Sequence, residues 1–464
     1  MRLWPRRGPL LREPDFLRLW AAQAVSAVGA RITRTALPVI AVLAVDARPS
    51  DLGILAAIAL GPSVLISLAI GGVVDRSRKR PILVTADLVR AAAVFSLPLA
   101  AWLGGLGMAQ LYIVAAVVGI ATAAFQIADN AYLPALVGKE HLVAANATIE
   151  ATEAVAEIGG PSLAGLLIQV LTAPFAMVID ALSYVVSAAL LGSIRKPEVP
   201  AAVEESPSVW RDIALGFGVS WSHPLVRPLL LATAMATFSG GSFAALYMLY
   251  VLGNLGLHVG TVGLVIAMGG VGSLFGALLS GPITRRIGLG PALLLLLALA
   301  EGSGLLIPAA SGSTWTVLII LFAHQLLGDG CSVAWVIQAV SLRQRVLPLE
   351  VLGRSNAAFQ AVTGAALPLG ALATGFLGDQ VGVRSALWIS MSSALIAPLL
   401  LLPLWRLRAS PGPAEPEASP LMAPPAAAAP VELAGPAAAP EPAAPDPAVA
   451  DAGSGSHPAR RPGR

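Results

Sequence analysis

Among the charged residues within long apolar runs of the sequence, four lie deep enough to do chemistry: Arg31, Arg34, Glu157 and Asp329. Ionisable side chains inside membrane-spanning segments are costly, and they mark substrate or proton paths. Arg31 and Arg34 are three residues apart and therefore share one helix face. At about 1.5 Å per residue, Arg31 lies roughly 16 to 22 Å into its run, near the centre of a bilayer core about 30 Å thick. We expect these residues to bind substrate or protons, with fixed structural ion pairs as the alternative.

The sequence does not contain the residue patterns that catalysis would need. The five histidines are scattered, without the spacing of a metalloprotease pair: His141, His223, His258, His324 and His457. The single cysteine, Cys331, excludes a disulfide framework and a thiolate-rich metal site. The Gly138-Lys139 pair is followed by Glu140, so the chain has no nucleotide-binding P-loop. We expect neither an enzyme nor a cofactor or metal, and an intramembrane enzyme is the rival from another class.

Composition indicates which elements must hold the four charges. Of the 464 residues, 56% are hydrophobic and 12% are charged, and the mean hydropathy is +0.78. A soluble fold cannot bury this much apolar surface, and a membrane β-barrel would show alternating strands of about ten residues. The composition therefore predicts an all-α, multi-pass membrane protein. It excludes a water-soluble enzyme, a nucleic-acid-binding module and a disordered scaffold.

Twelve apolar stretches are long enough to cross a membrane as helices of about 20 residues. They run over residues 16–45, 52–74, 82–103, 109–128, 143–171, 173–194, 226–252, 261–283, 289–309, 314–339, 357–377 and 386–404. With short loops they fill the first 408 residues. The remaining chain, residues 409–464, is rich in Ala and Pro, which predicts a disordered tail.

Basic residues divide the loops into two groups. If the twelve spans alternate, the even-numbered loops and both termini hold 24 Lys and Arg residues, whereas the opposite loops hold only Arg48 and Arg384. Positive residues concentrate on the cytoplasmic loops of membrane proteins. We therefore expect both termini in the cytoplasm, and the chain in the inner (plasma) membrane of a bacterium.

An internal repeat divides the chain into two similar halves. A shift of 210 residues places Glu140 and Asn146 on Glu350 and Asn356, and parallel repeats of this kind suggest alternating access between two six-helix bundles. The predicted organisation is a cytoplasmic arm (1–15), an N-terminal half (16–194), a cytoplasmic linker (195–224), a C-terminal half (225–408) and the tail (409–464). The linker segment Trp210–Trp221 is amphipathic, which predicts a short helix on the membrane surface.

The loop after the second span reads Gly71-Gly-Val-Val-Asp75-Arg76-Ser-Arg78-Lys79-Arg80. It resembles the signature G-x-x-x-D-R-x-G-R-K of the major facilitator superfamily, with Arg78 in place of the second glycine. The resemblance implies the twelve-helix major facilitator fold. It also implies a gating loop, which latches the halves on the cytoplasmic side and is formed by Gly71, Asp75, Arg76, Lys79 and Arg80. The basic residues are expected to contact anionic lipid, and an ordinary positive loop is the alternative.

Span five carries a second motif, Ala156-Glu-Ile-Gly159-Gly160-Pro161-Ser-Leu-Ala164-Gly165. It resembles the antiporter motif G-x-x-x-G-P-x-x-G-G of the same superfamily. Pro161 bends a helix, and small residues such as Gly160 and Gly165 permit close packing between helices. The resemblance implies export, and a Pro-kinked packing helix is the alternative.

Shorter stretches narrow the resemblance. Leu19-Trp-Ala-Ala-Gln23, Ala86-Asp87-Leu-Val-Arg90, Tyr132-Leu-Pro-Ala-Leu136, Asp180-Ala-Leu-Ser-Tyr184 and Leu352-Gly353-Arg354-Ser-Asn356 are similar to the enterobactin-exporter and macrolide-efflux branch. In this superfamily spans one, four, seven and ten line the cavity, which implies that Arg31 faces Asp329. We expect Asp329 to be the first partner of Arg31 and Glu157 the second. Glu301 ranks lower, and His324 is either a hydrogen-bonded core residue or a proton relay.

The resemblance implies a secondary active transporter that exports a small amphipathic molecule, such as a drug, a siderophore or a secondary metabolite. Export would proceed by alternating access with proton antiport, and an uptake symporter of the same fold is the alternative. Two departures remove common proton sites of the family, because span four has no arginine and Ala30 replaces an acid of span one. The expected partners are the substrate, protons and membrane lipid but no nucleic acid, and the chain is expected to be monomeric.

Overall fold

The structure is a computed structural model that describes residues 10, 13–61, 77–198 and 209–407. Regular structure within these residues is helical throughout. The predicted tail (409–464) and most of the predicted N-terminal arm (1–15) lie outside the described residues. The N-terminal half contains α1 (Pro14–Ala44), α2 (Pro49–Leu60), α4 (Lys79–Trp102), α5 (Met108–Val137), the short η2 (Lys139–His141), α6 (Leu142–Leu171) and α7 (Ala173–Gly192).

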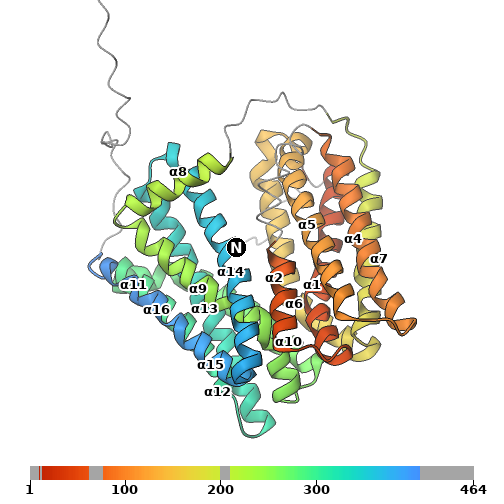
Figure 1. The fold of residues 1–464 in the computed structure, drawn as a ribbon. Coiled ribbons are helices and arrows are strands. Elements are labelled where there is room, and N and C mark those ends of the chain that lie inside the picture. The colour runs from red at the N-terminus through yellow and green to blue at the C-terminus, as the bar shows by residue number, and fades with distance from the viewer. Residues whose placement is uncertain (1–9, 11–12, 62–76, 199–208, 408–464) are drawn as a thin grey trace, which may run out of the picture. The chain divides into compact units, whose positions relative to one another are not determined.

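The C-terminal half repeats this arrangement after a linker helix, α8 (Val209–Ser222). Its helices are α9 (Val226–Leu249) with its π-helical continuation η3 (Tyr250–Asn254), α10 (Val259–Ile287), α11 (Leu289–Gly304), α12 (Leu306–Ala309), α13 (Thr314–Val346), α14 (Leu349–Val381), α15 (Val383–Ala394), α16 (Ile396–Leu399) and η4 (Leu402–Leu404). Figure 1 shows the two halves, one in red to yellow and the other in green to blue.

Eleven helical segments among the described residues are long and apolar enough to cross a membrane. The helix α2 has 12 residues, and the rest of the predicted second span, up to Val74, lies outside the described residues. Eleven spans and α2 together agree with the predicted order of twelve. The chain is therefore an all-α, multi-pass membrane protein.

Two helices extend well beyond their predicted ends. The helix α5 was expected to end at Ala128 but continues to Val137, where Gly138 adopts a positive φ of 79° and stops it. The helix α14 begins at Leu349 and ends at Val381, whereas its apolar stretch covers only residues 357–377. Hydropathy marks the part of a helix that suits the membrane interior, while backbone hydrogen bonding continues until a helix-ending residue.

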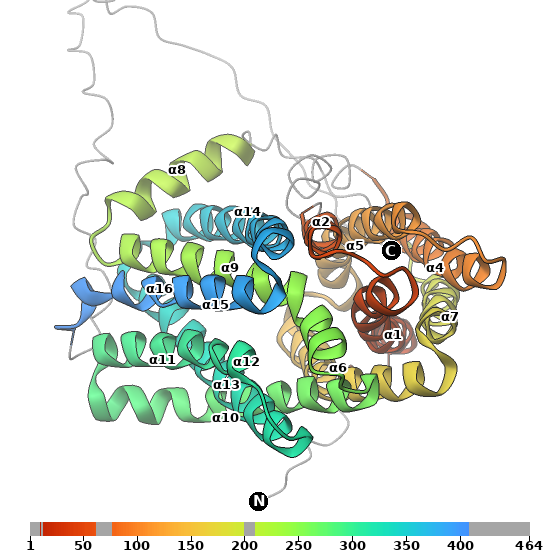
Figure 2. The same ribbon diagram turned by 60° about the horizontal axis from the view of Figure 1, so that its bottom comes forward.

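Each half is a bundle, and among the described residues the two halves meet mainly along two helix pairs, with smaller contacts of α9 on α1 and α2. Within the halves, α7 packs against α1 and α4, and α13 and α9 pack against α10 and α14 respectively. Between the halves, α6 packs against α10 and α2 packs against α14, as Figure 2 also shows. A glycine allows α2 and α14 to pack closely, because a Cβ on Gly53 would lie 2.7 Å from the carbonyl oxygen of Ala371.

The buried apolar side chains show which ends of the halves join. We call the end of the bundles that carries Arg80, Arg195, Arg286 and Arg354 the basic end, and the other the opposite end. One core cluster draws residues from both halves at the opposite end. At the basic end each half has its own core cluster, one between Leu10 and Ile194 and one between Val226 and Leu404. The halves are therefore joined at the opposite end.

The linker helix α8 agrees with the amphipathic helix predicted over Trp210–Trp221, and it packs on α14. A Cβ on Gly216 would overlap the carbonyl of Arg354. The Arg354 Nε lies 3.1 Å from the Asp212 Oδ1, and the buried Ser220 and Ser355 hydroxyls are 2.9 Å apart. One face of this helix is thus fixed to the C-terminal half.

Candidate functional site

Arg31 and Arg34 both face α6 from α1. The aliphatic stem of Arg31 packs on Gly160, where a Cβ would lie 2.6 Å from the Arg31 Cγ. Any larger residue at position 160 would push this stem away from α6. Gly160, the glycine before the proline of the antiporter-like motif, therefore determines where the Arg31 guanidinium lies.

Two carboxylates of α6 bind these arginines. The Arg31 Nη2 lies 3.2 Å from the Glu153 Oε2, and the Arg31 Nη1 forms an ion pair with the Glu157 Oε2. The other oxygen of Glu157 lies 3.6 Å from the Arg34 Nη1. Glu153 and Glu157 are one turn apart, so they present their charges on the same face of α6. Glu157 thus connects the two arginines across the two helices.

Asp329 is not the ion-pair partner of Arg31 in this structure. Its carboxylate packs on α10, where a Cβ on Gly269 would overlap its Oδ2 and would lie 3.3 Å from the Gln325 Nε2. The next residue of α10, Gly270, packs on Ile158, the neighbour of Glu157 in α6. The structure therefore assigns the arginine to Glu157, the second expected partner, and to Glu153.

A second polar row on α1, nearer the basic end, was missed in the sequence. The Gln23 Nε2 donates to the Asp129 Oδ1 at 2.6 Å, and the Trp20 Nε1 donates to the Thr152 hydroxyl at 2.9 Å. Asp129 was missed because its apolar stretch ends one residue earlier. The signal that could have found it is Gly138, the residue that ends this helix.

The other face of α1 meets a buried charged cluster. Asp87 and Arg90 of α4 form an ion pair, and Asp180 of α7 accepts hydrogen bonds from the hydroxyls of Thr33 and Ser183. The three charged residues are at most 4% exposed.

Two aromatic rings and one glycine complete this cluster. The Arg90 guanidinium lies 4.5 Å from the ring centres of both Phe125 and Tyr184. On α1, a Cβ on Gly29 would overlap the side chains of Asp180 and Ser183. The sequence marked these stretches only by their family resemblance, so this charged cluster was not predicted.

The described part of the predicted gating loop binds helix ends of its own half. The Arg80 Nε donates to the Leu191 carbonyl at 3.0 Å, and the Arg80 Nη2 donates to that of Gly192. The Glu198 carboxylate accepts the backbone N–H groups of Lys79 and Arg80 at the start of α4. Lys79 is 7% exposed, so this residue is packed against protein, and the expected lipid contact stays a prediction. Gly71, Asp75 and Arg76 lie outside the described residues.

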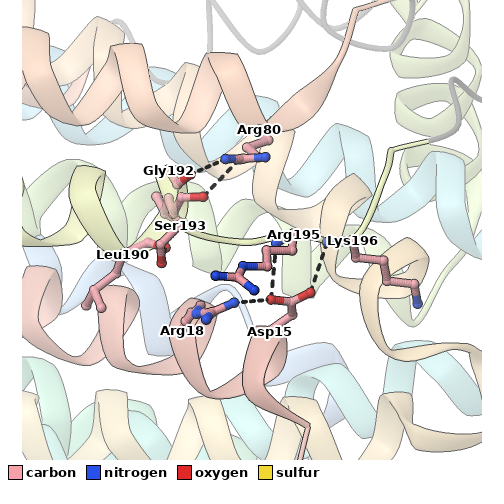
Figure 3. Close-up of polar contacts among 9 residues, drawn as sticks. Asp15, Arg18, Arg80, Leu190, Gly192, Ser193, Arg195 and Lys196 are labelled. Atoms are coloured by element: carbon pink, nitrogen blue, oxygen red, sulfur yellow. Dashed lines mark hydrogen bonds and ion pairs between the residues drawn. The ribbon is translucent and has the colours of Figure 1, made fainter.

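Asp15 holds the start of the linker against α1. Its carboxylate accepts the Arg195 and Lys196 backbone N–H groups at 3.2 and 2.9 Å, and the Arg18 Nη1 at 2.6 Å (Figure 3). An acid in the first turn of a helix suits the positive end of its dipole. The first linker residues therefore belong structurally to the N-terminal half.

The rest of the span-five motif forms the junction between the halves. A Cβ on Gly165 would lie 2.9 Å from the Val259 carbonyl oxygen, and one on Gly263 would lie 2.4 Å from the Pro161 carbonyl oxygen. The motif thus has Arg31 on one side and α10 on the other.

His324 belongs to the interior of the C-terminal half. In the described part of the chain, no three His, Cys, Asp or Glu residues gather as metal ligands would. The His324 Nδ1 lies 2.9 Å from the Ser303 carbonyl oxygen, which favours the core interpretation of His324.

Comparisons with known proteins agree with this architecture. The family model of the Major Facilitator Superfamily matches residues 19–300 and 229–445. Macrolide efflux protein A of Streptococcus pyogenes is 26% identical over 390 residues, which cover 82% of this chain and 93% of that relative. Enterobactin exporter EntS of Shigella dysenteriae is 26% identical over 410 residues, or 86% of this chain and 94% of that relative.

Solved structures show the same fold. A bacterial homologue of the iron transporter ferroportin, in an inward-facing state, superposes with a TM-score of 0.66 at 21% identity over 86% of this chain and 99% of that one. The two family-model matches together span most of the chain, including both halves. The chain is therefore a transporter that belongs to the major facilitator superfamily.

Proposed function

We propose that this chain exports a small amphipathic molecule from the cytoplasm in exchange for protons. The observation that carries this proposal is the bridge from Arg31 through Glu157 to Arg34, which lies deep in two spans and beside the junction of the halves. Ionisable residues at this depth in a membrane are energetically costly, so their presence marks a functional site. The efflux activities named for the two relatives support export rather than uptake.

Glu157 is the carboxylate that we assign to proton coupling. In this structure both arginines bind it. If substrate binding or helix movement draws Arg31 away, Glu157 loses its main counter-charge and takes up a proton in its place. Glu153 can keep Arg31 paired during this exchange, because it binds a different guanidinium nitrogen. Arg31, Arg34, Glu157 and Asp329 thus remain the proposed substrate and proton residues.

How the halves join supports alternating access. The shared core at the opposite end and the separate cores at the basic end describe a transporter closed on one side. The positive-inside rule assigns the basic end to the cytoplasm, so this state would accept substrate from inside the cell. Arg80 bonds only within its own half in the described residues, as expected when the gating loop does not latch the halves.

The proposal is tested by compound accumulation in bacteria that lack their main efflux pumps. Cells that express this chain should accumulate less of at least one amphipathic compound from a panel of drugs, siderophores and metabolites. An uncoupler should abolish the difference, because export depends on the proton gradient. Higher accumulation in expressing cells would indicate an uptake symporter instead. Export that persists with the uncoupler would contradict proton coupling.

A further inference from the structure

Three residues of the linker helix α8 form an apolar stripe. Ile213, Phe217 and Trp221 are four positions apart, so they lie on one face of the helix. The rings of Phe217 and Trp221 stack with their centroids 5.5 Å apart, and both residues are exposed. The residues that fix α8 to α14, Gly216 among them, each come one position before a residue of this stripe. The stripe therefore lies beside the face that is fixed to the C-terminal half.

An apolar groove lies between this stripe and α14, the two helices that Figures 1 and 2 show side by side. It has a volume of about 500 Å³, and Ile213 and Phe217 line it on the side of α8. Its wall on α14 is formed by Ala358, Ala361, Val362 and Ala365. Sites for small organic ligands are of about 300–1,000 Å³, so the groove is large enough for an apolar chain.

The groove lies at the depth where α14 enters the membrane. Its wall on α14 belongs to the first turns of the apolar stretch 357–377, whereas Arg354, which contacts α8, precedes this stretch. The loop charges assign this end of the bundle to the cytoplasm. The helix α8 then lies at the level of the lipid headgroups, where Trp residues such as Trp221 are enriched. The groove faces the acyl chains of the cytoplasmic leaflet.

Exposed arginines lie on and beside α8. The Arg227 guanidinium lies 4.4 Å from the centre of the Trp221 ring, and Arg211 is exposed in the first turn of α8. The Arg354 side chain is 44% exposed, although its Nε pairs with Asp212. Among the described residues, three arginines therefore accompany the one acid of α8. Basic residues beside an apolar helix face attract anionic lipid.

We infer that α8 and α14 bind an anionic phospholipid of the cytoplasmic leaflet, with an acyl chain in the groove and the headgroup at the arginines. A lipid without net charge would fill the groove equally well, but it would gain little from Arg211 and Arg227. The arginines therefore select the anionic class. This inference concerns a lipid partner and does not depend on which molecule the chain exports or on proton coupling.

Binding of two phospholipids with the same acyl chains tests the lipid class. The probes are dioleoyl phosphatidylglycerol, which is anionic, and dioleoyl phosphatidylcholine, which has no net charge. Each is titrated into the purified full chain in detergent, and bound lipids are counted by native mass spectrometry. Phosphatidylglycerol should saturate one site and bind more tightly than phosphatidylcholine. Equal affinities overturn the anionic class, and binding that does not saturate overturns the site.

A variant that fills the groove assigns the lipid to it. Ala361→Phe places a ring in the space meant for the acyl chain, so saturable phosphatidylglycerol binding should be lost. Leu278→Phe adds a ring on α10, where Leu278 is 65% exposed, and is the matched control that should bind as the native chain does. Native affinity in Ala361→Phe, in protein whose melting temperature is unchanged, overturns the assignment to the groove.

Two exposed arginines test the headgroup contact without changing the packing of the groove. Arg211→Gln and Arg227→Gln should each weaken phosphatidylglycerol binding roughly fivefold, because each removes one basic residue from the membrane surface. Phosphatidylcholine binding should stay the same. Arg286→Gln changes an exposed arginine of α10 at the same end and should have no effect. An unchanged preference for phosphatidylglycerol in both α8 variants overturns the inference.

The apolar part of the exported molecule is the other candidate for the groove. A compound that the accumulation test shows to be exported is therefore added in excess to the chain with bound phosphatidylglycerol. The lipid should stay bound. Displacement of the lipid, with the Ala361→Phe variant also losing affinity for the compound, would make the groove a substrate site and overturn the lipid assignment. Lipid binding is measured without transport, so its failure leaves the proposed export standing.

Discussion

Arg31 has its stem on Gly160 and its guanidinium on Glu153 and Glu157, so a single helix determines both where this side chain lies and what it binds. The sequence predicted that these residues are deep in the membrane, because charge stands out in apolar runs. It did not predict the pairing, since the partner of Arg31 depends on how closely α1 and α6 approach. Periodicity and hydropathy contain no information on that distance.

Replacement of Glu157 by Gln tests the coupling role at the residue scale. Glutamine keeps the shape of the side chain but cannot carry a charge or exchange a proton, while Glu153 still pairs with Arg31. We expect gradient-driven export to be lost and counterflow, which needs no net proton movement, to persist in proteoliposomes. Glu150→Gln is the matched control, because Glu150 lies on the same helix and is exposed. Gradient-driven export that survives in Glu157→Gln would make the Arg31 pairs structural.

Replacement of Arg90 by Ala tests the buried cluster of the N-terminal half. The change leaves Asp87, which is fully buried, without its cation, and stranding one member of a buried pair costs about 3–5 kcal/mol. We expect a clearly lower melting temperature for the purified variant, measured by size-exclusion chromatography of heated samples. Arg34→Ala should lower it much less, because the Arg34 side chain is 66% exposed. Equal melting temperatures for both variants would mean that the cluster adds no stability.

At the scale of elements, the sequence predicted the eleven long apolar helical segments of the described residues but not every helix end. The apolar stretch predicted both ends of α6 to within one residue. The helix α5, in contrast, continues nine residues past its apolar stretch and so includes Asp129. The antiporter-like motif predicted close packing, and the structure adds that Gly165 and Gly263 make the contact between α6 and α10. The packing partner could not be predicted, because small residues permit an approach without selecting a partner.

Two glycine substitutions on α6 test whether this contact is part of the transport cycle. In Gly165→Ala the new methyl group would lie 2.9 Å from the Val259 carbonyl oxygen, so α6 and α10 must separate. We expect transport to fall severalfold in Gly165→Ala while the protein still inserts into the membrane. Gly159→Ala adds the same methyl group where no atom lies within 4 Å and should transport normally. The prediction fails if both variants transport alike.

At the scale of the whole molecule, the two-half organisation could be predicted from the repeat and from the alternation of loop charge. The end at which the halves join could not be predicted, because an alternating transporter closes at either end with the same sequence. The structure shows which end is joined: the halves share one core cluster at the opposite end, and each has its own core cluster at the basic end.

The orientation of the chain is tested by reporter fusions. The loop charges predict that residues after Arg408 and the linker segment 201–208 are both in the cytoplasm. A fluorescent protein fused at either place should fluoresce, and alkaline phosphatase at the same place should be inactive. Phosphatase activity at either position would contradict the twelve-span topology.

The central claim is that substrate export and proton entry are one coupled process. It is tested most directly by adding a substrate from the accumulation panel to proteoliposomes of the native chain that contain a pH-sensitive dye, with no gradient imposed. Substrate that moves through the protein should drive protons in the opposite direction, and the dye should report a pH change that Glu157→Gln abolishes. Substrate movement without any pH change, in the native chain, would contradict the account.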